Sequence, residues 1–257
     1  MASPFEPPYV LSSTAQHTHT IIALHGRGSQ GAEFADELFE ETTSSGLNLR
    51  DTFPGCKWVF PSSQERYSTV FQEELDEWFD IYSLSDPSQR EDLQIEGLHD
   101  SVEFIQSVIN HECTLVSPDR VIVLGLSQGS AVGLLGLLAS GRRLGAYIGL
   151  SGWLPLKEQI GRCHALKDLD NFFRTELGLQ GSVSTEQSSM LGTPILLGHT
   201  TDDEVIDIEL GRQAFEVLDN LGMRVTWKEL PDGGHLGMLK TEGLDSIVTF
   251  LDGLVHR

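Results

Sequence analysis

Runs of consecutive apolar residues alternate along this chain with segments whose apolar residues recur at helical spacing. The run at 121–124 (VIVL) is branched and apolar without alternation, as in a strand buried on both faces. Leu98, Val102, Ile105 and Ile109 recur at the spacing of one face of an amphipathic helix. The same criteria predict strands at 19–26, 57–61, 121–124, 146–152, 193–199 and 224–230.

Strands alternate with helices in this pattern, and that order predicts an α/β fold with a mostly parallel sheet covered by helices on both faces. Further helices are expected at 34–41, 210–221 and 247–254. In such sheets, sites lie outside the carboxyl ends of the strands. We expect residues 1–18 to form an N-terminal extension and residues 19–257 to form a single domain.

The segment 157–192 interrupts the alternation, because it is long and shows no strand pattern. We expect a short helix at 166–173 followed by an exposed polar stretch. One interpretation is a lid that covers an apolar site with Phe172, Phe173 and Met190. The other is a surface insertion whose aromatic residues belong to the core.

Composition narrows the function classes. A net charge of −21 repels phosphate backbones and anionic lipid, so no nucleic acid partner is expected. Acidic clusters at 72–80 and 202–209 indicate solvated surface or, alternatively, attraction of a cationic substrate. No run of 18 apolar residues predicts a transmembrane segment, and the N-terminal sequence lacks the features of a secretory signal. Three cysteines among 257 residues favour a reducing compartment. We expect a cytoplasmic location, with the nucleus as an additional site.

The first candidate site is the pentapeptide Gly125-Leu126-Ser127-Gln128-Gly129, of the form G-x-S-x-G, between a predicted strand and a predicted helix. A sharp strand-to-helix turn exposes the serine oxygen and points the helix N-terminus at a reacting carbonyl. The alternative is a tight connection with an incidental serine. A nucleophilic serine also needs a nearby base and an acid that orients the base.

A second glycine motif competes with the first. Gly26, Gly28 and Gly31 fit G-x-G-x-x-G in the first strand-to-helix turn, as in dinucleotide-binding proteins. That function needs an acidic residue at the end of the second strand, where Pro61 and Ser62 stand instead. The same glycines suit a loop that points a backbone N–H into an oxyanion hole.

The rest of the chain supplies an acid and a base in the order found in α/β-hydrolases. Asp202 and Asp203 follow one predicted strand, and His235 follows the next in a glycine loop. On position alone, either aspartate fits. His199 ends a strand and is a rival base, but no acidic residue follows it on a later strand. No His/Cys cluster has zinc-ligand spacing, so neither a metal nor a cofactor is expected.

Six segments in order resemble the acyl-protein thioesterase and phospholipase/carboxylesterase family, α/β-hydrolases of the cytosol, in its fungal-type branch. The resemblance extends from residue 19 to the end of the chain. The segments are LHGRGSQG (24–31), EWFDIYSLS (77–85), GLSQGSA (125–131), LSGWLPL (150–156), HTTDDEVI (199–206) and GGH (233–235).

The resemblance implies an α/β-hydrolase fold and roles for individual residues. Ser127 would be the nucleophile, His235 the base and Asp203 its orienting acid. Backbone N–H groups of Arg27 and Gln128 would form the oxyanion hole. Trp153 and Leu154 would lie beside the acyl site.

The activity implied is a serine hydrolase that cleaves acyl thioesters or carboxylic esters, possible substrates being an S-acylated protein, a lysophospholipid or a small ester. A non-catalytic binding protein with this fold is the alternative from another class. Arg27, Ser29 and Thr200 depart from the family pattern, which affects substrate identity more than reaction type. The sequence leaves a monomer and a weak dimer equally open.

Overall fold

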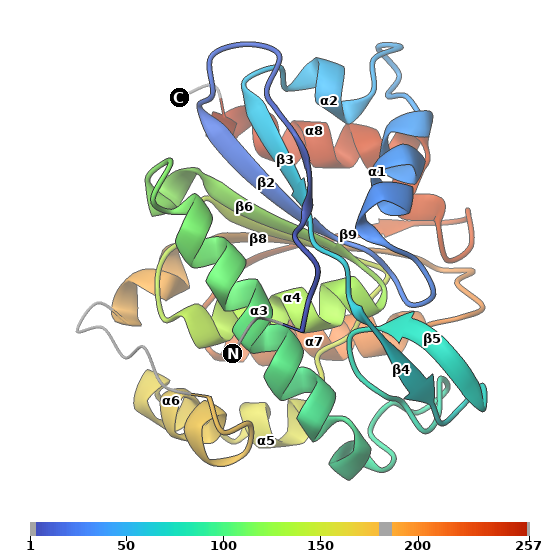
Figure 1. Ribbon diagram of the computed structural model, residues 1–257, viewed down its shortest axis with the longest axis vertical. Helices are drawn as coiled ribbons and strands as arrows, with labels where there is room; N and C mark the ends of the chain where they lie inside the picture. The colour runs from blue at the N-terminus through green and yellow to red at the C-terminus, as the bar shows by residue number, and fades with distance from the viewer. Residues whose placement is uncertain (1–3, 180–186, 256–257) are drawn as a thin grey trace.

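A seven-stranded sheet forms the centre of the molecule in the computed structural model, which describes residues 4–179 and 187–255 (Figure 1). The strand order is β1-β3-β2-β6-β7-β8-β9. Strand β1 pairs antiparallel with β3, and every other pairing in this sheet is parallel. The strands are β1 (Tyr9–Leu11), β2 (His19–Leu24), β3 (Cys56–Phe60), β6 (Val121–Leu126), β7 (Ala146–Leu150), β8 (Pro194–Thr200) and β9 (Arg224–Leu230). The predicted α/β fold is confirmed.

Helices cover both faces of the sheet. One face carries α1 (Gly31–Glu40), α2 (Leu49–Thr52) and α8 (Thr241–Val255). The other carries α3 (Ile95–Glu112), α4 (Gln128–Ser140), α5 (Lys157–Gly161), α6 (Leu166–Thr175) and α7 (Ile208–Asn220). Short 3₁₀ turns complete the connections: Glu91–Leu93, Pro118–Arg120, Gln187–Gly192 and Gly237–Leu239. Within the described part of the chain, no helix is both long and apolar enough to cross a membrane.

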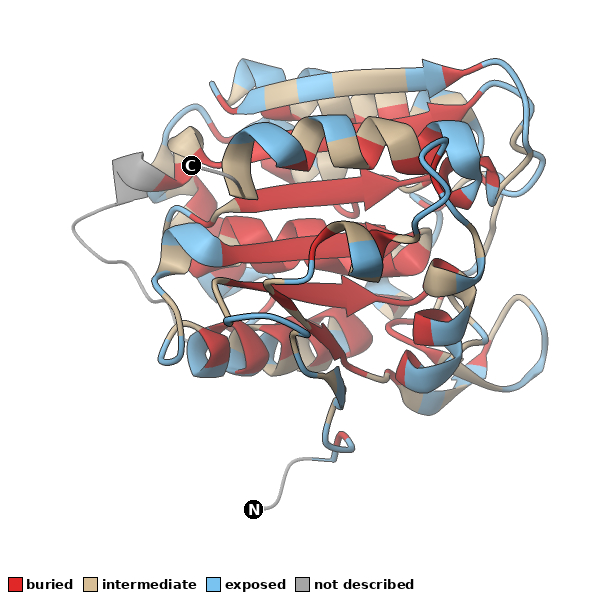
Figure 2. Ribbon diagram, turned by 90° about the horizontal axis from the view of Figure 1, so that it is seen from above, coloured by how far each residue is buried: buried red, intermediate tan, exposed pale blue. Residues whose placement is uncertain are grey.

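Strand alternation divides the core into two layers, because successive side chains point to opposite faces of a sheet. Ile22 and Val123 lie in the layer beneath α3 and α4, whereas Ile21 and Ile122 lie in the layer beneath α1 and α8. Both layers are apolar, and so the central strands read as unbroken apolar runs in the sequence. The same strands are buried along their length in Figure 2.

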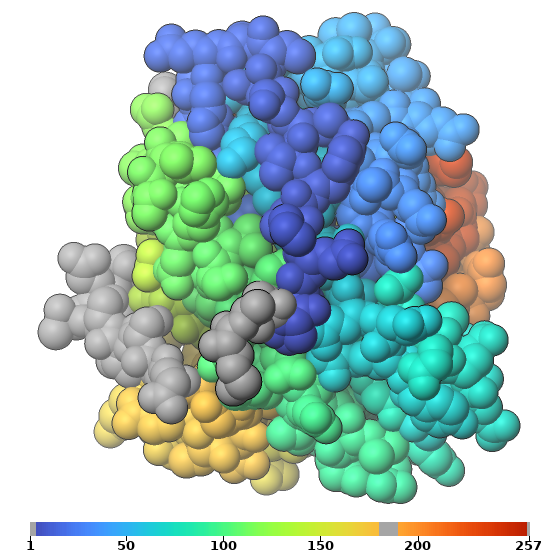
Figure 3. Space-filling model, viewed as in Figure 1, coloured from blue at the N-terminus to red at the C-terminus, as the bar shows by residue number. Residues whose placement is uncertain are grey.

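Part of the expected N-terminal extension belongs to the domain. Val10, at the centre of β1, is in register with Val59 of β3, so the sheet begins before residue 19. The ring of Phe5 stacks on Phe104 of α3 with their centroids 4.1 Å apart. In Figure 3 the described N-terminal segment, in dark blue, runs across the visible face of the molecule between the green and the lighter blue parts of the chain.

A two-stranded antiparallel hairpin, β4 (Gln64–Ser68) and β5 (Glu73–Glu77), lies outside the main sheet. Its residues are mostly polar and charged, so the apolar pattern of the sequence does not predict it. The hairpin matters for the site because β5 runs directly into Trp78 and Phe79, which are fully buried.

Candidate active site

Ser127 occupies the turn between β6 and α4 with φ 54° and ψ −121°. This backbone conformation is strained for a residue with a side chain, and such strain is typical of functional positions. The flanking glycines allow the turn to close. A Cβ on Gly125 would lie 2.4 Å from the carbonyl oxygen of Gly129, and a Cβ on Gly129 would lie 2.3 Å from that of Leu24. The predicted strand-to-helix turn is therefore present.

The first strand-to-helix turn lies directly against the serine. A Cβ on Gly26 would lie 3.5 Å from the Cβ of Ser127. The buried side chain of His25 supports this turn, because its Nδ1–H donates to the carbonyl of Gly26 (2.6 Å) and its Nε2 accepts the N–H of Ser63 (2.9 Å). Burial lowers the pKa of His25 to about 4, which keeps its ring neutral at physiological pH.

Gln128 and the hairpin hold the same turn from the other side. The Gln128 side chain accepts the N–H of Trp78 (2.8 Å) and donates to the carbonyl of Phe79 (2.6 Å). The indole N–H of Trp78 donates to the carbonyl of His25 (2.9 Å). The two backbone segments that carry Arg27 and Gln128 are thus cross-linked by buried hydrogen bonds, which suits groups that must be preorganised.

The glycines of the competing motif have packing roles here. A Cβ on Gly31 would lie 2.3 Å from the carbonyl oxygen of Phe60, so only glycine lets α1 start against the end of β3. Gly28 has φ 77°, and its N–H donates to the carbonyl of Asp76 (2.7 Å). No acidic side chain stands at the end of β3, where a dinucleotide ribose would need one.

Asp203 and His235 meet at the carboxyl edge of the sheet, although 32 residues separate them. The Nδ1 of His235 lies 2.8 Å from Oδ2 and 3.0 Å from Oδ1 of Asp203. The Asp203 side chain is fully buried, and burial alone would raise its pKa. Hydrogen bonds from His199 and His235 outweigh that effect and hold the pKa of Asp203 well below its usual range. The carboxylate is therefore ionised at neutral pH.

The neighbouring aspartate has a different task. Asp202 is exposed and accepts the N–H groups of Gly233 (3.2 Å) and Gly234 (2.9 Å), so it shapes the loop that carries His235. Thr200 donates its hydroxyl to the carbonyl of Gly234 (2.7 Å). Thr200 departs from the family pattern, and its hydroxyl anchors the same loop.

Trp153 and Leu154 are buried in a loop that starts beside the serine turn. A Cβ on Gly152 would lie 3.1 Å from the carbonyl oxygen of Ser127. The Trp153 ring contacts Phe79, with centroids 6.0 Å apart. The two side chains are 4% and 3% exposed, so in this conformation they line the interior. Their role as acyl contacts stays a prediction.

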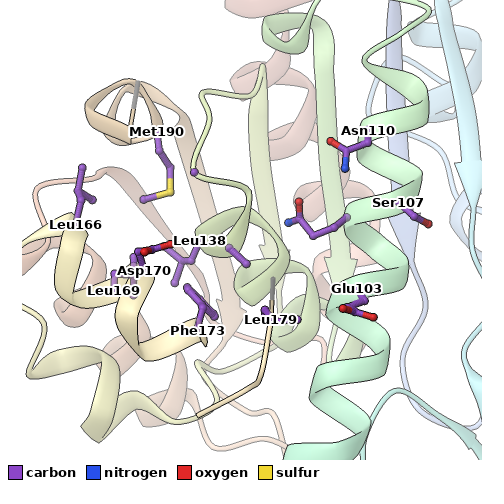
Figure 4. A pocket seen from close by; sticks show the side chains of 13 residues that line it. Glu103, Ser107, Asn110, Leu138, Leu166, Leu169, Asp170, Phe173, Leu179 and Met190 are labelled. Atoms are coloured by element: carbon purple, nitrogen blue, oxygen red, sulfur yellow. The ribbon is translucent and has the colours of Figure 1, made fainter. Parts of the chain in front are cut away.

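The aromatic residues of the 157–192 segment lie at the other end of α4. Helix α4 has 13 residues, so its far end is roughly 20 Å from Ser127. There, Leu138 of α4, Phe173 of α6 and Met190 line a cavity of about 280 Å³ (Figure 4). Phe172 is also buried, in the core layer shared with α3 and α4. This placement favours the interpretation as core aromatics. A lid stays a prediction, and residues 180–186 lie outside the described part of the chain.

The sequence patterns gave no sign that Glu77 is buried near the site, and they pointed to His199 only as a rival base. The acidic cluster at 72–80 predicts solvated surface, but Glu77, the last residue of β5, is fully buried. Among the described residues, neither carboxylate oxygen has a hydrogen bond of good geometry, although the nearby hydroxyl of buried Ser68 favours the charged form of Glu77. Burial and nearby Asp80 raise the pKa of Glu77 to about 7, although Arg27 opposes this. The sequence of β5, EELDE, has no alternation of polar and apolar residues that could have revealed it.

Glu77 predicts a specific dependence of stability on pH. Unfolded Glu77 loses its proton near its usual pKa, whereas folded Glu77 holds it to about 7. Between these values the folded state binds more protons, so the free energy of unfolding should fall as pH rises from about 4.5 to about 7. Glu77→Gln should therefore stabilise the protein at pH 8 by on the order of 2 kcal/mol and have little effect at pH 5.

Urea unfolding at both pH values measures this difference. Glu74→Gln is the matched control, because Glu74 lies on the same strand but is exposed. A Glu77→Gln variant with the same stability change at pH 5 and pH 8 would contradict a protonated, buried Glu77.

A serine on a strand-to-helix turn, at the sheet edge where an aspartate binds a histidine, defines the α/β-hydrolase class. The phospholipase/carboxylesterase family model matches residues 6–168 and 175–255. The chain belongs to this family, as the sequence motifs indicated. The short gap in the match falls within α6, in the segment that interrupts the strand–helix alternation.

Curated relatives and solved structures agree with this membership. The chain is 28% identical over 248 residues to acyl-protein thioesterase 1 of Gibberella zeae, covering 95% of this chain and 94% of that protein. It is 28% identical over 253 residues to acyl-protein thioesterase 1 of Yarrowia lipolytica, covering 96% and 97%. The crystal structure of Zea mays acyl-protein thioesterase 2 superposes with a TM-score of 0.73 at 24% identity, covering 96% of this chain and 98% of that one. The last comparison shows the fold.

Proposed function

We propose that this protein is a serine hydrolase that cleaves acyl thioesters and carboxylic esters, with Ser127, His235 and Asp203 as its catalytic triad. The observation that carries the proposal is the pairing of His235 with the buried Asp203 carboxylate at the sheet edge that also presents Ser127 on a strained turn. The names of its relatives support thioesters, including those of S-acylated proteins, as substrates.

In this mechanism, Asp203 accepts the Nδ1–H of His235, which leaves the lone pair on Nε2 free to act as a base. Nε2 takes the hydroxyl proton as Ser127 Oγ attacks the acyl carbonyl. The N–H groups of Arg27 and Gln128 stabilise the oxyanion. The thiolate or alkoxide leaves with the proton from His235, and water then attacks the acyl-enzyme by the same route and releases the acid.

The family description also supports a second candidate in the same reaction class, a small-ester carboxylesterase or lysophospholipase. The two candidates differ in the acyl group that the site accepts. A non-catalytic binding protein would hydrolyse neither substrate. We also propose a cytoplasmic location, which the unpaired state of all three cysteines supports.

A series of aryl esters and acyl thioesters of increasing chain length tests the proposal. An apolar acyl channel gains about 0.8 kcal/mol for each methylene it buries. A long-chain thioesterase should therefore show kcat/KM rising from acetyl toward octanoyl and longer substrates. Preference for acetyl esters would favour the carboxylesterase, and absence of turnover with every substrate would contradict a hydrolase.

A further inference from the structure

His199 and His235 both lie within hydrogen-bond distance of the Asp203 carboxylate. His199 is the next-to-last residue of β8 and is 1% exposed. Its Nε2 lies 3.1 Å from Oδ2 of Asp203 and 2.9 Å from the carbonyl oxygen of Ile206. The ring is held on two sides: the Trp227 ring is 6.4 Å away, and a Cβ on Gly211 of α7 would lie 2.7 Å from its Nδ1.

The contacts of His199 settle which nitrogen carries a hydrogen. A backbone carbonyl and an ionised carboxylate can only accept hydrogen bonds. Nε2 donates to the Ile206 carbonyl, so it is the protonated nitrogen, and the same nitrogen lies 3.1 Å from Oδ2 of Asp203, which offers a second acceptor. His199 therefore directs an N–H group, and not a nitrogen lone pair, toward Asp203.

Both carboxylate oxygens of Asp203 accept hydrogen bonds. Oδ1 accepts the backbone N–H groups of Val205 and Ile206, each at 2.9 Å. Oδ2 accepts from His235 and lies 3.1 Å from Nε2 of His199. Among the described residues, His199 is the only side chain besides His235 within hydrogen-bond distance of this carboxylate.

We propose that His199 is a positioning residue: by donating to Oδ2 of Asp203 and to the carbonyl of Ile206, it fixes the carboxylate in the orientation that aligns the His235 ring. This inference rests on the proposed triad. His199 is buried behind the aspartate, so it acts through Asp203 and not on the substrate. The charged groups that face it are Asp203 and, from the adjacent strand β9, Glu229.

Loss of this donor should lower kcat and leave KM almost unchanged. Without His199, the Ile206 carbonyl loses its side-chain donor and Oδ2 of Asp203 retains only His235. The carboxylate and the ring bound to it can then shift together. Misplacement of a catalytic group by about 1 Å can cost about 100-fold in rate. We therefore expect kcat to fall about 10- to 100-fold in His199→Leu.

His199→Gln is the informative partner variant, because a glutamine amide can place donor hydrogens near the position of the imidazole Nε2. It should recover most of the lost kcat. Trp227→Phe is the packing control, since it alters the ring beside His199 without removing a donor to Asp203. It should keep kcat within about threefold of the wild type, a change too small to come from misalignment of this kind.

Proton NMR gives a readout that does not depend on turnover. Two imidazole N–H protons held against one carboxylate should give two far-downfield resonances in the wild type. His199→Gln should retain only the resonance of His235. This measurement keeps the inference testable if His199→Leu does not fold.

Labelling with a fluorophosphonate probe separates the two proposals. A wild type that neither reacts with the probe nor turns over esters would refute the hydrolase itself. An active, labelled wild type whose folded His199→Leu variant keeps full kcat would overturn only the role of His199. A glutamine variant as slow as the leucine variant, or a single downfield resonance in the wild type, would overturn it as well.

Discussion

Ser127→Ala should lower turnover of an acyl thioester about a million-fold, as expected when a triad nucleophile is removed. Among the described residues, Ser127 alone combines a strained strand-to-helix turn with a place at the sheet edge of the Asp203–His235 pair. The alanine variant should fold normally, because the strain belongs to the backbone and the Ser127 N–H still donates to Leu150.

Two measurements check this result: steady-state kinetics, and labelling with a fluorophosphonate probe. Ser130→Ala is the matched control. Ser130 lies three residues further along, at the start of α4, and its hydroxyl contacts the Tyr147 hydroxyl (3.2 Å). The control should stay labelled and active. Labelling that survives in Ser127→Ala would end the proposed mechanism.

Asp203→Asn should lower kcat about ten-thousand-fold. An asparagine amide can donate to Nδ1 of His235, which would hold the ring in the tautomer that carries its hydrogen on Nε2. That tautomer cannot accept the serine proton. The substitution also removes the buried negative charge that stabilises the imidazolium formed during attack.

Asp202→Asn is the matched control for this prediction, because it changes the adjacent residue in the same way. Its side-chain oxygen can still accept the N–H of Gly234, so the histidine loop should keep its shape. We expect kcat within about tenfold of the wild type. The hydrogen bond from Gly234 is kept, and it changes only from one with a charged acceptor to one with a neutral acceptor. If Asp202→Asn were the slower variant, the acid would have been assigned to the wrong aspartate.

Much of the fold follows from local patterns in the chain. The central strands are buried on both faces, so they appear as unbroken apolar runs. Helices such as α3 and α7 show an apolar stripe, whereas α4 is buried on nearly every side. The serine turn is also local, because Gly125, Ser127 and Gly129 lie within five residues. These features required no knowledge of distant contacts, and each one is present in the structure.

Local sequence patterns did not predict strand β1 or the burial of Glu77. Strand β1 is three residues long and depends on its register with β3, about 50 residues away. The polar hairpin buries Glu77 only because β5 runs into the core at Trp78. The acidic pattern at 72–80 indicated solvated surface, and no local signal distinguished Glu77 from its exposed neighbours.

The sequence by itself determined the α/β class and the family, and it predicted a nucleophile, an acid and a base in the order found in α/β-hydrolases. Tertiary structure decided which polar groups meet. His199 looked like a rival base, yet parallel pairing of β8 with β9 and the bend after β8 place its Nε2 on Asp203. The physical reason is the distance along the chain over which each signal acts. Side-chain periodicity is local and indicates which face of an element is buried. A hydrogen bond between side chains depends on where two distant loops place their atoms.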